Sequence, residues 1–175
     1  DNLVYSVMNA FYIACSSFVG QNYGAGKPER VRRSYFLTLG YSALAAAVFG
    51  GLFLLFGRQF LSLFSPESAV IDAGMERIAV MCFSFPVSAL MDCTTSASRG
   101  LGKGLVPMVF VFLGSCVFRI AWIYTVFAHF RTLGSLYLLY PFSWLITGAA
   151  EIVYFFYCYR KYVWPLGAQA GGPAR

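Results

Sequence analysis

The chain has 175 residues, of which 59% are hydrophobic and only 11% are charged. A soluble globular domain has about 25% charged residues, so this composition excludes that class and indicates an integral membrane protein. The net charge of +6 does not indicate a nucleic-acid partner, because the basic residues lie at the ends of apolar segments and form no patch.

Five apolar segments follow one another, and each is long enough for a bilayer-crossing helix, which needs roughly 20 residues. They cover residues 3–20, 34–57, 68–98, 105–130 and 133–159. The sequence therefore predicts an all-α fold, a polytopic membrane bundle of five transmembrane helices over residues 1–163. Pro86 predicts a kink in the third helix. Residues 164–175 are rich in Gly, Pro and Ala and predict a flexible cytoplasmic tail.

Basic residues indicate how the bundle is oriented. They gather in the first loop, the third loop and the C-terminal end, as Lys27, Arg30, Arg32 and Arg33, then Arg99 and Lys103, then Arg160 and Lys161. Cytoplasmic loops are enriched in Lys and Arg, so we expect these three regions to be cytoplasmic. The expected location is the cytoplasmic (inner) membrane of a prokaryote. The chain starts at Asp1 with no signal sequence, which suggests a fragment or a gene model that starts late.

Small residues recur every four positions in the second segment, at Ala43, Ala47 and Gly51. Such a stripe allows the backbone of a neighbouring helix to approach closely. We therefore expect this face of the second helix to pack within the bundle.

Polar residues at steps of three and four lie on one face of four of the five segments. These sets are Tyr5, Asn9, Tyr12 and Ser16; Ser84, Ser88, Asp92 and Ser96; Ser115, Arg119 and Trp122; and Tyr140, Ser143, Thr147 and Glu151. An ionised side chain at bilayer depth costs about 3 kcal/mol on insertion scales, so these faces should point inward. The Ser and Thr residues are interpreted mainly as interhelical contacts, worth about 0.6 kcal/mol each. Intramembrane ionisable groups usually mark a transport pathway.

These patterns give a set of candidate substrate or ion pathway residues, namely Asn9, Tyr12, Ser88, Asp92, Arg119, Thr147 and Glu151. We expect Arg119 to neutralise Glu151 in one conformation, leaving Asp92 open to a proton or a cationic substrate. The alternative is a permanent Arg119–Glu151 pair that only holds the fourth and fifth helices together.

Other motifs indicate neither an enzyme nor a cofactor. The segment GQNYGAGK has Gln21 where a phosphate loop needs its first glycine, and Pro28 where that loop needs Ser or Thr. With one histidine and five cysteines without paired spacing, we expect no metal site. No nucleophile, base and orienting group can be assembled, so we expect no enzymatic activity.

Four segments in order resemble a known family. VGQNYGAGKPERV resembles the motif that follows the second helix of each half in MATE (multidrug and toxic compound extrusion) transporters. MDCTTSASRGLGKGLVPM, FRIAWIY and PFSWLITG resemble later segments of the C-terminal half. The resemblance covers about residues 3–162.

The resemblance implies helices eight to twelve of a twelve-helix, two-lobe carrier that exchanges protons or sodium for organic cations. The implied partners are an organic cation, the coupling proton or sodium, the bilayer and the missing N-terminal lobe. The family's acidic position in the tenth helix falls near Ser88, whereas this chain has Asp92 one turn later, so no sodium site is carried over. The motif residues expected to be structural are Gly20, Gln21, Asn22, Gly24, Gly26, Lys27, Arg99 and Gly100.

The first hypothesis is therefore a secondary efflux antiporter, of which this chain is a partial lobe without transport activity of its own. One alternative is a lipid-linked oligosaccharide flippase of the same superfamily, which generally lacks the GQNxGAGK loop. Another is a non-transporting membrane scaffold whose polar stripes are dry. The sequence does not name the substrate, the coupling ion or the oligomeric state.

Overall fold

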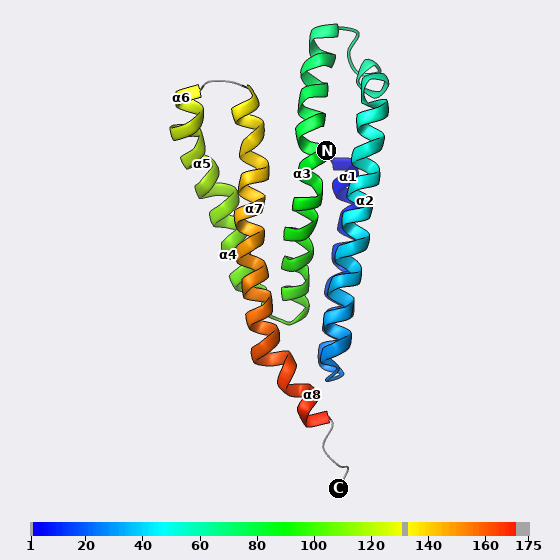
Figure 1. Cartoon of the computed structure of the whole chain (residues 1–175), viewed down its shortest axis with the longest axis vertical. Coiled ribbons are helices and arrows are strands. Elements are labelled where there is room, and N and C mark those ends of the chain that lie inside the picture. Colours follow the sequence, from blue (N-terminus) through cyan, green and yellow to red (C-terminus); the bar gives the residue numbers. More distant parts are fainter. Residues whose placement is uncertain (1, 131–132, 171–175) are drawn as a thin grey trace.

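The computed structural model describes residues 2–130 and 133–170, which form helices and turns without any strand (Figure 1). The long helices are α1 (Asn2–Gly24), α2 (Pro28–Ser62), α3 (Ser68–Gly100) and α7 (Leu133–Cys158). Between α3 and α7 lie α4 (Leu105–Phe112), the π-helix η1 (Leu113–Val117), α5 (Phe118–Trp122), the π-helix η2 (Ile123–Phe127) and α6 (Ala128–Phe130). The π-helix η3 (Tyr159–Val163) and α8 (Trp164–Ala170) follow α7. The predicted all-α fold is confirmed.

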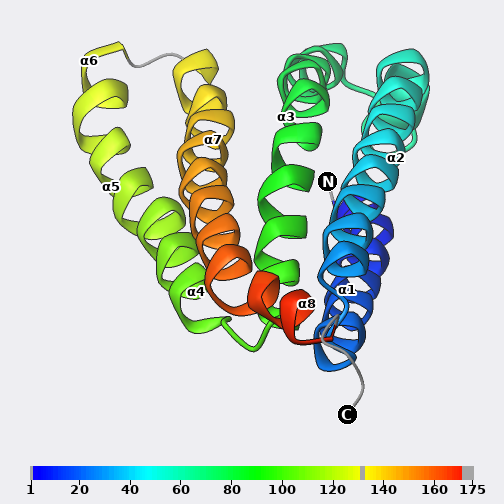
Figure 2. The same ribbon diagram turned by 60° about the horizontal axis from the view of Figure 1, so that its bottom comes forward.

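Helix α3 is the centre of the bundle, because α1, α2 and α7 all pack against it. The segments α4 to α6 form an arm that packs mainly against α7. Helices α3 and α7 lie close together near α8 and diverge towards the end where α6 lies, in both views (Figures 1 and 2). Helix α1 is shorter and begins partway along α2 and α3 (Figure 1).

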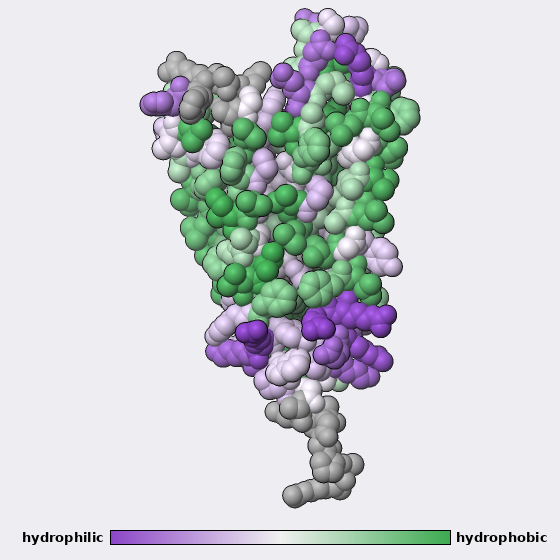
Figure 3. All heavy atoms as spheres, in the orientation of Figure 1, coloured by the Kyte–Doolittle hydropathy of each residue, from purple (hydrophilic) through white to green (hydrophobic). Residues whose placement is uncertain are grey.

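Four helical stretches are long and apolar enough to cross a membrane, namely Pro28–Ser62, Ser68–Gly100, Leu105–Phe127 and Tyr137–Gly167. Apolar residues form a broad band across the face of the molecule shown in Figure 3, with polar residues at both ends. Helix α1, the remaining predicted span, is not among the four. The protein is a membrane helix bundle, and the membrane crossing by α1 stays a prediction.

The first turn of α2 shows why this helix starts earlier than its apolar segment predicted. Pro28 occupies the first turn, where its missing N–H costs no helical hydrogen bond. Glu29 follows in the same turn, where a negative charge is favourable. The helix therefore includes the basic residues of the loop, and only Ala25, Gly26 and Lys27 separate it from α1.

Pro86 lies inside α3, which is one helix from Ser68 to Gly100, and the kink expected there stays a prediction. One further expectation differs from the structure. Residues 164–170 of the predicted flexible tail are helical, as α8, and a Cβ atom placed on Gly167 would lie 2.7 Å from Cγ of Pro28. That close approach against α2 explains the order of this segment. Residues 171–175 lie outside the described residues.

The packed face of α2 is also displaced from the predicted one. Ser42, Ala46 and Gly50 are buried, and the Cys82 thiol of α3 donates a hydrogen bond to the Gly50 carbonyl at 3.1 Å. Ala47 is exposed, and a Cβ atom at Gly51 would meet no atom within 4 Å. The prediction of Ala43, Ala47 and Gly51 as the packed stripe was wrong, because two small-residue stripes with the same period lie side by side on this helix.

The two glycine-containing motifs meet between α1 and α3. A Cβ atom added to Gly100 would lie 2.5 Å from the Ser16 carbonyl oxygen, and one added to Gly20 would lie 3.2 Å from the Gly100 carbonyl oxygen. A glycine at these positions lets the two helix backbones touch. The end of α3 is therefore fixed against the end of α1.

Replacing Gly100 with alanine should destabilise the bundle by about 1–3 kcal/mol, because the added methyl group has no room against the Ser16 carbonyl. Gly24→Ala is the matched control, since a Cβ atom there meets nothing within 4 Å. The apparent melting temperature of the detergent-solubilised protein should fall for Gly100→Ala and not for Gly24→Ala. Equal melting temperatures for the two variants would contradict this packing.

Oxidation with copper–phenanthroline should join Cys15 of α1 to Cys93 of α3, because their Sγ atoms lie 3.6 Å apart in the core. Peptide mapping by mass spectrometry should find this cross-link in the wild type and in a Cys116→Ser variant, since Cys116 is exposed and lies on the arm. The cross-link should be absent from Cys93→Ser. A cross-link from Cys15 to any other cysteine would show that the helices pack differently.

Candidate functional site

A cavity of about 330 Å³ lies between α1, α3 and α7, on the side where α3 and α7 diverge (Figure 2). Its polar lining includes Asp92, Ser88 and Arg77, all from α3. Arg77 precedes Asp92 by four turns, about 22 Å along the helix axis, so the cavity is elongated along α3. It is the best candidate for a ligand site, because it is concave, mainly apolar and contains few polar groups.

Asp92 contributes a carboxylate group to the lining of this cavity. The Ser88 hydroxyl, one turn earlier on α3, donates a hydrogen bond to Asp92 Oδ2 at 3.0 Å. This bond fixes one carboxylate oxygen, and the side chain of Asp92 is only partly buried. Asp92 can therefore meet a cation in the cavity without breaking a salt bridge within the described chain.

Aromatic and thioether side chains form the rest of the lining. Tyr5 and Met8 come from α1, Met81, Phe85 and Met91 from α3, and Tyr140 and Trp144 from α7. The rings of Tyr140 and Trp144 pack edge to face with centroids 5.9 Å apart. Aromatic faces attract cations, and methionine side chains adapt to ligands of different shape.

Arg119 of α5 contacts one ring of this aromatic pair and does not itself line the cavity. Its guanidinium carbon lies 4.7 Å from the ring centroid of Tyr140, in a cation–π contact. Its Nε atom is buried and has no hydrogen-bond partner among the described residues. The arm thus contacts the cavity wall through Tyr140.

Glu151 lies outside the cavity, in the contact between α7 and α3. Its side chain is completely buried, and its Oε2 atom accepts a hydrogen bond of 2.6 Å from the Thr95 hydroxyl. Its Oε1 atom has no partner among the described residues. The two acidic residues therefore have different surroundings, since Asp92 faces a cavity and Glu151 a packed interface.

Arg119 and Glu151 are not paired in this structure, so the alternative of a permanent pair was wrong, and a pair in another conformation stays a prediction. Arg119 is level with Tyr140, which precedes Glu151 by eleven residues, about 16 Å along α7. Asp92 bonds to Ser88 and stays open to the cavity, as expected. The arm that carries Arg119 diverges from α7 and contains two π-helical segments, so a position along the arm does not face the position on α7 that residue counting predicts (Figure 2).

Three further candidate residues lie away from the cavity. Asn9 is exposed on α1, whereas Tyr12 belongs to the buried face of that helix and its hydroxyl has no described partner. Thr147 is buried and bonds to the Ser143 carbonyl. Ser143 in turn donates to the Gly114 carbonyl of η1 at 2.8 Å, so these α7 residues attach the arm. Ser88 and Asp92 are the candidates that line the cavity.

Sequence reasoning missed several lining residues on α3, namely Arg77, Met81, Phe85 and Met91. A signal was present, because positions 77, 81, 85, 88 and 92 follow one another at steps of four, four, three and four. That spacing marks one helix face. Met81, Phe85 and Met91 are apolar and so do not belong to a polar stripe, and Arg77 lies seven residues before Ser84, where the predicted stripe begins.

The loop-motif residues form a structural junction at the other end. Gln21 and Asn22 lie in the last turns of α1, where the Asn22 amide donates to the Phe18 carbonyl at 2.7 Å and to the Ser34 hydroxyl of α2 at 3.4 Å. Of the three glycines in the loop motif, Gly26 has a positive φ, of 65°, whereas Gly20 and Gly24 are helical. Lys27 and Arg99 are exposed. The described residues contain no group of three or more His, Cys, Asp and Glu side chains that could hold a metal ion.

Comparison with known proteins agrees with the motifs. The sequence profile of the MatE family matches residues 1–125. The chain is also 27% identical over 102 residues to "Protein DETOXIFICATION 8" of Arabidopsis thaliana, an alignment that covers 58% of this chain and 21% of that protein. The aligned part thus spans about a fifth of the length of this relative. The profile match covers α1, α2, α3 and most of the arm, so the chain belongs to the MatE family of membrane transporters.

Proposed function

We propose that this chain is part of a secondary antiporter that exports organic cations in exchange for protons or sodium. The observation that carries the proposal is the Asp92 carboxylate, which Ser88 orients inside a cavity with aromatic and thioether walls. Attraction to an aromatic face is worth about 0.5–2 kcal/mol, and a carboxylate adds a directional charge. Such a site suits flat, apolar cations.

Competition for one carboxylate gives a physical basis for exchange. A proton, a sodium ion or an organic cation can each neutralise Asp92, and the binding of one lowers the affinity for the others. This coupling is reciprocal, so a proton that binds on one side of the membrane favours release of the organic cation there. The coupled cycle also requires that the cavity open to each side in turn.

The second wall of the pathway is proposed to come from an N-terminal lobe. The open side of the cavity includes Tyr5 of α1, whose side chain is 53% exposed, and Asn9 lies on an exposed part of the same helix. Asn9 therefore stays a candidate pathway residue, one that would meet the substrate only across the interface between the lobes. The five-helix part described here is one side of this interface.

Glu151 is proposed to act through the contact between α3 and α7. It meets Thr95 directly and does not line the cavity. Thr95 lies three residues after Asp92 on α3, so the Glu151–Thr95 bond couples the position of α7 to the helix that carries the carboxylate. Glu151 is thus a positioning residue.

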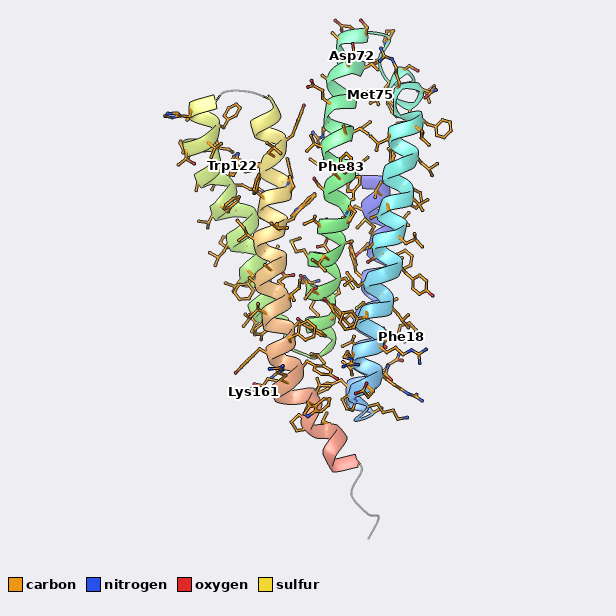
Figure 4. All side chains as sticks on the ribbon, viewed as in Figure 1. Phe18, Asp72, Met75, Phe83, Trp122 and Lys161 are labelled. Atoms are coloured by element: carbon orange, nitrogen blue, oxygen red, sulfur yellow. The ribbon has the colours of Figure 1, made fainter. Side chains whose placement is uncertain are left out.

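The orientation is proposed from the charge of the two ends. Lys161 and Asp72 lie at opposite ends of the bundle (Figure 4). The end with Lys161 also contains the basic loop residues and is expected to face the cytoplasm. The C-terminus would then be cytoplasmic, and the inner membrane of a prokaryote stays a prediction.

Asp92→Asn in the natural full-length protein should reduce efflux of ethidium, an organic cation, by at least about tenfold, because one charge of the site is lost. Asp72→Asn is the matched control, since Asp72 forms an exposed ion pair with Arg58 at 3.1 Å, away from the cavity. Efflux is measured at equal amounts of protein in the membrane. Unchanged efflux in Asp92→Asn would refute the role of this carboxylate.

Glu151→Gln should keep both protein level and efflux, because the amide oxygen can still accept the hydrogen bond from Thr95. Glu151→Ala should lower the stability of the protein by about 1–3 kcal/mol, since it leaves the Thr95 hydroxyl without this partner and creates a cavity. Protein level and melting temperature report stability, and ethidium efflux reports transport. Loss of efflux at normal protein level in Glu151→Gln would show instead that Glu151 must carry a charge or a proton.

A further inference from the structure

We propose that a groove between the start of α2 and the segment η3–α8 binds the phosphate group and an acyl chain of an anionic membrane phospholipid. The groove has a volume of about 500 Å³ and is lined by Arg32, Phe156, Tyr159, Arg160 and Trp164. It lies apart from the cavity that contains Asp92, with which it shares no lining residue.

Contacts between α2, η3 and α8 hold the two arginines on one groove. The Tyr159 hydroxyl donates a hydrogen bond to the Pro28 carbonyl at 3.1 Å. The close approach of Gly167 to Pro28 fixes α8 against the same turn of α2. Arg32 follows Pro28 by one turn and Arg160 follows Tyr159 directly, so these contacts place the backbone of both arginines beside one groove.

The charge of the groove is positive and largely uncompensated. Arg32 Nη2 lies 3.8 Å from Glu29 Oε2, and both side chains are more than half exposed, so this ion pair is weak. Arg160 is exposed and has no acidic partner among the described residues. Two guanidinium groups facing one groove match a phosphate, because each can donate two parallel hydrogen bonds to its oxygens.

The apolar side of the groove identifies the phosphate as that of a lipid. A second groove of about 650 Å³ shares Phe156 and Arg160 with the first and continues along Ile152, Val153 and Tyr157 of α7. The side chain of Val153 is 71% exposed, so this helix face can cover an acyl chain. Lys161 marks the level of these grooves in Figure 4, where the apolar band of Figure 3 gives way to polar residues in the same orientation. Basic pockets at this level suit anionic headgroups.

Native mass spectrometry of the natural full-length protein in detergent tests the site. Phosphatidylglycerol and phosphatidylcholine are added in turn, and the apparent Kd of each is measured for the wild type and for Arg32→Gln/Arg160→Gln. The double substitution should weaken phosphatidylglycerol binding by about tenfold or more and leave phosphatidylcholine binding unchanged, since each basic residue contributes to anionic-lipid binding. Both arginines are exposed, so the variant should keep the wild-type melting temperature.

The matched control is Arg30→Gln/Arg33→Gln. It also removes two positive charges, both from the start of α2, and does not change the lining of the groove. It should change the phosphatidylglycerol Kd by less than about twofold. Inorganic phosphate at millimolar concentration should not displace the lipid. Equal loss in both double variants would show a diffuse surface charge and overturn the proposal. So would displacement by free phosphate, equal binding of both lipids, or a wild type that retains no phosphatidylglycerol because polypeptide fills the groove.

Discussion

A bilayer offers no hydrogen-bonding partner to a polar side chain, so each such group in this bundle must be met by protein or by water in a cavity. Helix α3 is where this constraint acts most strongly. Thr94 of α3 bonds to the Tyr35 hydroxyl of α2 at 2.9 Å, Thr95 bonds to Glu151 of α7, and Cys93 lies beside Cys15 of α1. One short stretch of α3 thereby meets all three of its neighbours. Asp92, which directly precedes these residues on α3, faces a cavity instead.

The arrangement separates a tightly packed half of the bundle from an open half. Glycines bring the ends of α1 and α3 into backbone contact, and Gly148 of α7 lies close to Met91 of α3. Helices α3 and α7 diverge towards the end where α6 lies (Figure 2). Side chains of α1, α3 and α7 line the cavity there. The packed half holds the helices in fixed register. The side chains of the open half line the cavity and do not form a packed core.

Much of the fold could be predicted from the sequence, because hydrophobic segment length and loop charge depend on local composition. Four of the five predicted apolar spans and the short loop around Gly26 are confirmed. The MatE family was expected from the resemblance of four motifs, and it is confirmed by the profile match. The sequence placed Ser88 and Asp92 on one face but could not show which helices stand opposite it. It paired Arg119 with Glu151 because two opposite charges at bilayer depth need partners. In the structure Arg119 contacts an aromatic ring, and Glu151 accepts a hydrogen bond from a hydroxyl group. The sequence could not predict these partners, because the divergence of the arm depends on packing between helices and not on a local pattern.

The contact between Gly100 and Ser16 also bears on the order in which the bundle assembles. N-terminal segments leave the ribosome first, and residues 2–100 already contain both sides of the α1–α3 and α2–α3 interfaces. A three-helix unit can therefore close before the arm has been synthesised. The hydrogen bond between Thr95 and Glu151 can form only later, because Glu151 follows Thr95 by 56 residues. Helix α7 follows α1, α2 and α3 in the chain and carries an acidic group to a surface that these three helices have already built, so its arrival completes the wall of the cavity.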